Sequence, residues 1–138
     1  MGLGLGYTYL DTEQRSGDNE GNELANAPHH HFSAQARYSV QQWQASLNAQ
    51  YVSDSFSDAD NTRQETANGD AGKLPSYTLV NARISRDIAV GSGNNLNLGV
   101  AATNLLDEDY YFRGADVSPV GRVPGAGRAL ILEGRLDF

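Results

Sequence analysis

The sequence lacks cysteine and has one methionine, one tryptophan and four prolines among its 138 residues. Without cysteine, the chain can form neither a disulfide framework nor a thiolate metal site. Ten basic residues against seventeen acidic ones give a net charge of −7, which argues against a protein that tracks the phosphates of a nucleic acid. The length limits the chain to one domain at most.

Long hydrophobic runs are also missing. No segment approaches the roughly 20 apolar residues that a membrane-spanning helix needs. The first residues lack the basic start and apolar middle of a secretion signal. These absences exclude a helical membrane protein but not a β-barrel membrane protein, whose strands need only about 9 to 11 residues of alternating character.

Alternation of apolar and polar residues is the dominant pattern, and it predicts strands with two different faces. Leu79 and Ile131 are its misfits. No segment with helical periodicity is left over, so the expected fold is all-β and antiparallel. The six alternating segments are Gly2–Asp11, Phe32–Val40, Trp43–Ser53, Tyr77–Arg86, Asn95–Asn104 and Arg128–Phe138.

The connections between these segments alternate between long and short. The long ones are 12–31, 54–76 and 105–127, and the short ones are 41–42 and 87–94. Outer-membrane barrels show this arrangement, with short periplasmic turns and long external loops. The long connections also hold most of the seventeen acidic residues, which predicts one acidic rim.

The two faces of the expected sheet differ in the medium that they suit. One face carries Leu, Ala, Val and Gly, as lipid contact requires, and the other carries charged residues that suit a water-filled lumen. Aromatic residues fall near both ends of the apolar face and predict two interfacial girdles. Tyr7, Tyr9, Phe32 and Tyr51 would lie near the long loops, and Tyr38, Trp43 and Phe138 near the short turns.

A soluble antiparallel sheet with one buried face is the alternative, because it also alternates. It gives no reason for sorting the connections by length and charge. Six strands are fewer than the eight of the smallest single-chain barrels, and the chain begins inside a strand without a secretion signal. We therefore expect the C-terminal piece of a larger transmembrane barrel.

Four stretches resemble the TonB-dependent outer-membrane receptors. Leu74-Pro-Ser-Tyr-Thr-Leu-Val-Asn-Ala-Arg-Ile-Ser is similar to that family's "LPGYTLVDARISY" strand, and Gly99-Val-Ala-Ala-Thr-Asn-Leu-Leu-Asp-Glu-Asp-Tyr-Tyr to its "NVNNLFDKEYY" strand. Gly21-Asn-Glu-Leu-Ala-Asn-Ala-Pro-His-His-His-Phe resembles "GNRLPNAPRHT", and the last four residues, Arg-Leu-Asp-Phe, resemble the terminal "RYRF". The resemblance spans the whole chain.

The resemblance implies that residues 1–138 are the C-terminal part of the barrel domain, the last six strands of a 22-stranded barrel whose N-terminal plug is absent here. It implies a Gram-negative outer membrane, lipid contact, the barrel assembly machinery, and a TonB complex acting through the plug. The implied activity is uptake of a ferric siderophore or similar chelate, without catalysis or a cofactor. Residues 112–128 resemble the siderophore and ferric citrate branch.

Several single residues are candidates for function. Phe138 and Leu136, in the terminal alternating strand, resemble the signal that the assembly machinery reads. Arg113 and Arg122 could bind carboxylate or catecholate oxygens of a chelate, because arginine forms bidentate hydrogen bonds. Loop salt bridges are an equally good role for them. The aromatic walls of such a site would be Tyr110 and Tyr111.

No metal site is expected. His29, His30 and His31 would point to alternate faces of an extended chain, so one ion could not gather them. Asp54, Asp58 and Asp60 lie close in sequence but lack the glycine and closing glutamate of a calcium loop, which favours a solvated acidic loop.

Three glycines alternate with other residues at the start of the chain. Gly2, Gly4 and Gly6 do not have the spacing of a dinucleotide-binding motif. They would lie on the lumen face, open to close approach by another element such as a plug.

A barrel hydrolase would need a nucleophile beside a base, but no serine motif accompanies the three histidines. A passive diffusion pore or adhesin is the other alternative, and uptake independent of the proton gradient would favour it.

Overall fold

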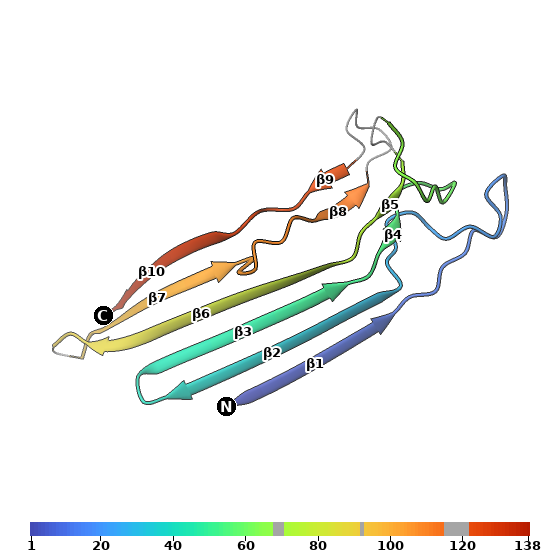
Figure 1. Ribbon diagram of the computed structural model, residues 1–138. Coiled ribbons are helices and arrows are strands. Elements are labelled where there is room, and N and C mark those ends of the chain that lie inside the picture. Colours follow the sequence, from blue (N-terminus) through green and yellow to red (C-terminus); the bar gives the residue numbers. More distant parts are fainter. Residues whose placement is uncertain (68–70, 92, 115–121) are drawn as a thin grey trace.

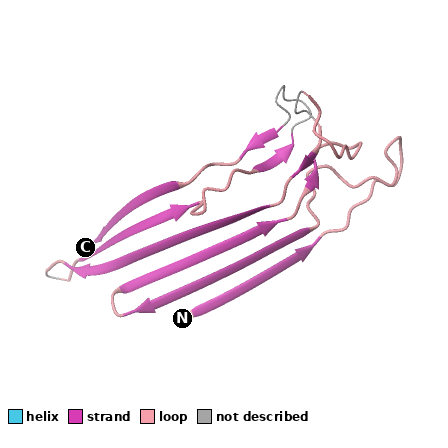
Figure 2. Ribbon diagram, viewed as in Figure 1, coloured by secondary structure: helices cyan, strands magenta, loops and turns pink. Residues whose placement is uncertain are grey.

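A computed structural model of the chain describes residues 1–67, 71–91, 93–111 and 122–138, and the backbone of 112–114. Its main element is one six-stranded antiparallel sheet (Figures 1 and 2). Among the described residues, no helix is long and apolar enough to cross a membrane. In spatial order, the strands of the sheet are β1 (Gly2–Tyr9), β2 (His30–Val40), β3 (Trp43–Val52), β6 (Tyr77–Ala89), β7 (Asn95–Thr103) and β10 (Ala129–Asp137).

Each strand of the sheet pairs with its neighbour in sequence, so the connections separate to opposite ends. The described residues of the short turns after β2 and β6 lie at the same end as both termini, and those of the long loops lie at the other end (Figure 1). We call residues 10–29, 53–76 and 104–128 the first, second and third long loops. This separation confirms the arrangement that the connection lengths predicted.

The predicted strands are confirmed with shifted ends. β6 continues to Ala89, beyond the predicted end at Arg86, because Asp87, Ile88 and Ala89 pair with β7. The turn that was expected to begin at Asp87 therefore begins later. The alternation identified no strands within the long loops, which hold two hairpins, β4 (Ser55–Phe56) with β5 (Lys73–Leu74) and β8 (Tyr111–Gly114) with β9 (Arg122–Pro124).

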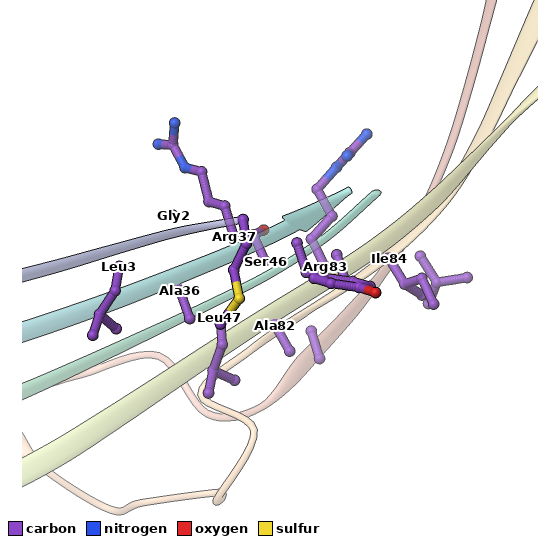
Figure 3. Close-up of a pocket in the computed structure, with 14 residues that line it drawn as sticks. Gly2, Leu3, Ala36, Arg37, Ser46, Leu47, Ala82, Arg83 and Ile84 are labelled. Carbon is purple, nitrogen blue, oxygen red and sulfur yellow. The ribbon is translucent and has the colours of Figure 1, made fainter. Parts of the chain in front are cut away.

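The strand register places the apolar positions on one face of the sheet. Figure 3 shows Leu3, Leu47 and Ala82 on this face, with Arg37 and Arg83 extending from the opposite one. We call these the apolar face and the polar face. One row of paired residues crosses all six strands on the apolar face: Leu3, Ala36, Leu47, Ala82, Ala102 and Leu130.

No described segment covers the apolar face. Leu132 is 84% exposed, and Leu3, Leu5 and Leu130 are also exposed. Buried apolar residues gather instead near the long loops, where Phe56 and Leu74 lie. An uncovered apolar face of this size is typical of a surface that contacts lipid or another protein. The alternative, a sheet with one buried face, would need a segment over the apolar face, and the described residues provide none.

Candidate functional site

The second long loop has its own small core at the rim of the sheet. Phe56 of β4 and Leu74 of β5 are 7% and 3% exposed, and Val52 at the end of β3 is also buried. Burial of such a side chain contributes about 1.5 to 3 kcal/mol. Lys73 forms an ion pair with Asp54, and its ammonium lies 5.4 Å from the centre of the Phe56 ring. The loop is therefore a folded element of the rim.

Asp58 organises the turn inside this loop. One oxygen of its carboxylate accepts hydrogen bonds from the backbone amide and the hydroxyl of Thr62, at 3.2 and 3.0 Å. The other oxygen accepts one from the amide of Gly72 at 3.3 Å. The expected solvated acidic loop is thus wrong for Asp58, which is half-buried, whereas Asp60 is exposed.

The first and second long loops are held together by hydrogen bonds. The amide of Glu23 donates to Asn61 Oδ1 at 2.7 Å, and Asn61 Nδ2 donates to the carbonyl of Glu23 at 2.9 Å. Asn22 adds a bond to the carbonyl of Ala59 at 2.9 Å. Asn61 has a φ of 56°, in the left-handed region that asparagine tolerates better than most residues. The two loops therefore form one surface.

Arg122 joins the third long loop to the second. Its side chain is 13% exposed, and Nη1 lies 3.3 Å from Glu65 Oε1. Nη2 donates to the carbonyl of Lys73 at 3.4 Å, and the guanidinium carbon lies 5.2 Å from the centre of the Tyr111 ring. In this state Arg122 serves as a loop salt bridge, one of the two roles that the sequence left open. An anionic ligand would have to compete with Glu65.

The two candidate aromatic residues face different partners. Tyr111 lies against Arg122, as the predicted site requires. Tyr110 instead lies 4.6 Å from Tyr77, between ring centres, and its ring occupies the space that a side chain at Gly125 would need. The structure therefore brings Tyr111 and Arg122 together and places Tyr110 in the loop packing. Arg113 is part of β8, and its side chain lies outside the described residues.

Asn104 is a structural residue of the third loop that periodicity did not reveal. It is buried with a φ of 47°, and its amide donates to Asn81 Oδ1 at 2.9 Å. Its side-chain Nδ2 donates to the carbonyls of Glu108 and Ala126, and Oδ1 accepts from the amide of Glu108. The side chain thus ties the start of the loop to its end.

Asp107 makes a second tie across the same loop. Its carboxylate accepts a hydrogen bond from the amide of Arg128 at 3.1 Å and pairs with the Arg128 guanidinium at 3.3 Å. Both Asn104 and Asp107 fall within the stretch that resembles the family's "NVNNLFDKEYY" strand. That resemblance was the only signal in the sequence that could have marked them.

An ion pair crosses three strands on the polar face. Arg83 of β6 contacts Glu133 of β10 at 2.7 Å and donates to the Ser85 hydroxyl at 2.9 Å. The pair passes over Gly99 of β7, where an added Cβ would lie 3.1 Å from the Glu133 carboxylate. Asp87 extends the polar network by accepting from Asn97 at 2.6 Å. This network gives the polar face a fixed charge pattern.

The glycines of β1 do not leave an open surface throughout. Gly4 lies under the side chain of Gln35, and Gly6 lies under that of Ser33. Gly2 has no neighbour within 4 Å of an added Cβ. Polar side chains of β2 therefore occupy the space above Gly4 and Gly6 that was expected to be open to another element.

The predicted girdle residues lie in the expected register. Near the long loops, the ring centre of Phe32 is 4.4 Å from that of Tyr7 and 6.3 Å from that of Tyr51. Tyr9 lies beside His30, 5.4 Å between ring centres. At the end of the sheet near the short turns, Trp43 is the first residue of β3. The other two predicted girdle residues at this end are Tyr38 and Phe138.

The three histidines have separate surroundings. His29 Nε2 lies 3.1 Å from the carboxylate of Glu23, and His30 Nδ1 is 2.9 Å from the hydroxyl of Tyr7. His31 follows on the opposite face of β2. Within the part of the chain that the structure describes, no three histidine, aspartate or glutamate side chains gather as metal ligands would.

Comparison with known proteins agrees with this architecture. Residues 1–105 match the family described as TonB dependent receptor-like, beta-barrel. The structure of the unliganded ferric citrate transporter FecA is similar with a TM-score of 0.86 and 32% identity, over 96% of this chain and 20% of FecA.

Two further structures share the fold at lower identity. The siderophore receptor PiuA from Acinetobacter baumannii gives a TM-score of 0.71 and 23% identity, over 94% of this chain and 18% of PiuA. BauA, the ferric preacinetobactin receptor from the same species, gives 0.74 and 22%, over 99% of this chain and 20% of BauA. The chain thus spans about a fifth of the length of these structures. It belongs to the TonB-dependent receptor family and forms part of the β-barrel domain.

Proposed function

We propose that this chain is part of the barrel wall of an outer-membrane receptor that takes up a ferric chelate, ferric citrate or a ferric siderophore. The observation that carries the proposal is the similarity to FecA, at 32% identity over 96% of the chain. The sheet supports it, because one face is apolar and uncovered while the other carries a network of charged and amide side chains.

The proposed mechanism involves no bond chemistry. The long loops capture the chelate at the external rim, and the polar face lines the route behind them. Movement of a plug, pulled by a TonB complex in the inner membrane, would open that route. The part of this chain is to hold the rim in place, through the contacts of Asn61, Asn104 and Arg122 between and within the loops.

The proposed ligand contacts are Arg122, Tyr111 and Arg113 of β8, with Tyr110 supporting the loop. A carboxylate or catecholate oxygen would replace Glu65 as the partner of Arg122. Because Arg122 also lies against the Tyr111 ring, the guanidinium would keep its orientation during this exchange. The iron chelate is the cargo, and the proposal needs no resident cofactor.

The surroundings follow from the same proposal. The receptor would lie in the outer membrane of a Gram-negative bacterium, with lipid against the apolar face. Its remaining strands and plug would lie outside residues 1–138. The exposed Phe138, which follows Leu136 of β10 at a spacing of two, would be the signal read by the barrel assembly machinery.

Uptake of radioactive iron tests the proposal. Cells that make the outer-membrane protein carrying this sequence are supplied with ⁵⁵Fe as ferric citrate or as ferric siderophores, and matched cells lack the protein. We expect that the uptake of at least one chelate requires the protein. This uptake should stop when the proton gradient is collapsed. Uptake that survives the collapse would indicate a diffusion pore, and no uptake of any chelate would refute the proposed cargo.

A further inference from the structure

Arg86 is a cation on the apolar face of the sheet. It pairs with Trp43 of β3 and Leu98 of β7, which both belong to that face. Arg37 and Arg83 lie on the polar face instead. Arg86 is exposed, and its side chain has no hydrogen bond or ion pair with any described residue. Its guanidinium therefore lies on the apolar face with no anionic partner among the described side chains.

Trp43 holds this guanidinium near the short-turn end of the sheet. The guanidinium carbon of Arg86 lies 5.2 Å from the centre of the Trp43 ring, within the range of a cation–π contact. Trp43 directly follows the turn at 41–42. In an outer-membrane barrel the short turns face the periplasm, and tryptophan and arginine both favour the interface where lipid headgroups begin. The pair thus lies at headgroup depth.

An apolar groove leads away from the pair. It has a volume of about 430 Å³ and is lined on the apolar face by Trp43, Ile84, Arg86, Ile88, Leu98 and Val100. A second groove of about 550 Å³, shown in Figure 3, shares Ile84 and Val100 with it and continues past Leu47 and Ala82. The two grooves make one apolar path from Arg86 to the middle of the sheet.

We propose that Arg86 and Trp43 bind the phosphate of a glycerophospholipid in the periplasmic leaflet, with one acyl chain lying in this groove. The charges are complementary, because the phosphate supplies the anion that Arg86 lacks, and guanidinium and phosphate form bidentate hydrogen bonds. The acyl chain covers side chains that no described segment covers. The inference rests on the proposed function, since it requires the sheet to face a bilayer.

Native mass spectrometry tests the site. The whole outer-membrane protein in detergent is titrated with dioleoylphosphatidylglycerol, or with diolein, which has the same acyl chains and no phosphate. We expect Arg86→Gln to raise the Kd of the first phosphatidylglycerol about fivefold, the loss expected for one arginine at an anionic membrane surface. Diolein should bind both forms equally. Arg37→Gln removes the same charge from the polar face and should leave the Kd unchanged.

Three results would overturn the site. The first is equal phosphatidylglycerol affinity in the wild type and in Arg86→Gln, and the second is an equal loss of affinity in Arg37→Gln. The third is a wild-type protein that binds phosphatidylglycerol no better than diolein, which decides the question even if Arg86→Gln fails to assemble. A protein that transports a ferric chelate without this preference refutes the lipid site alone. A protein that shows the preference without transport refutes the proposed function alone.

Discussion

At the scale of single residues, buried polar side chains explain why the long loops have defined shapes. Asn104 makes three side-chain hydrogen bonds, two with Glu108 and one with Ala126 at the other end of the third loop, and its backbone amide donates to Asn81 Oδ1. Buried hydrogen-bonding groups are costly to leave unpaired. Removal of one such side chain should therefore make the loop open more often without changing the strands.

Asn104→Ala should make the third loop more susceptible to protease. Three hydrogen bonds at roughly 1 kcal/mol each are lost, so the open state of the loop should become about 100-fold more populated. Limited proteolysis of the whole receptor measures this change. Asn48→Ala is the matched control, since the side chain of Asn48 is exposed on the polar face and makes no hydrogen bond to another described residue. Equal cleavage of both variants would contradict the role given to Asn104.

Substitutions at Arg122 and Glu65 can show whether Arg122 binds the chelate or only forms a salt bridge between the loops. If Arg122 binds the chelate, Arg122→Gln should weaken binding about tenfold by removing a charged hydrogen bond. Glu65→Gln should strengthen binding, because the competing carboxylate is gone. Equilibrium binding of ferric citrate or a ferric siderophore to the purified receptor measures both. Weaker binding in both variants would show that the pair acts only by holding the loops together.

Gly99 and Gly134 provide a matched pair of substitutions on opposite faces. A Cβ at Gly99 would lie 3.1 Å from the Glu133 carboxylate and 3.3 Å from the Ser85 Cβ, whereas at Gly134 it would meet Leu98 at 3.8 Å. Gly99→Leu should therefore lower the free energy of unfolding by about 1 to 3 kcal/mol, the usual cost of overpacking. Gly134→Leu should be tolerated. The heat-dependent shift in gel mobility measures both, and a greater loss in Gly134→Leu would contradict the assigned faces.

At the scale of elements, the six strands of the sheet could be predicted because each has eight or more residues over which the alternation repeats. The hairpins β4–β5 and β8–β9 could not, since strands of two to four residues offer too few positions. Their pairing depends on contacts between distant loop residues, such as Ser55 with Leu74. For the same reason, the contacts of Asn61 and Asn104 could not be predicted. Residue type alone selected Arg122 and Tyr111 as candidate ligand contacts, and the structure shows that these two side chains lie together.

Leu47 and Asn48 test the register of β3, because they are adjacent and lie on opposite faces. Arginine on the lipid side of a barrel costs roughly 2 to 4 kcal/mol near the membrane centre. Leu47→Arg should therefore reduce the amount of folded receptor in the outer membrane far more than Asn48→Arg. The folded fraction is measured by heat-modifiable gel mobility. Equal losses would show that the two faces are assigned incorrectly.

At the scale of the whole molecule, the sheet is open along β1 and β10. Each edge strand has a neighbour on one side only, β2 and β7. A sheet within a bilayer must leave no edge unpaired, because lipid offers no hydrogen bonds. The chain spans about a fifth of the similar structures, so the strands that close the barrel would belong to the remainder of the receptor. The alternation in the sequence shows which residues share a face of the sheet, but it cannot show how the barrel closes.

Spin labels along β3 test most directly whether lipid lies on one face and water on the other. Cysteines at Ala45, Ser46, Leu47 and Asn48 in the whole receptor are labelled, since residues 1–138 contain no cysteine. We predict high collision rates with oxygen and low rates with a water-soluble nickel chelate at Ala45 and Leu47, and the reverse at Ser46 and Asn48. Equal accessibility to both reagents along the strand would contradict the account.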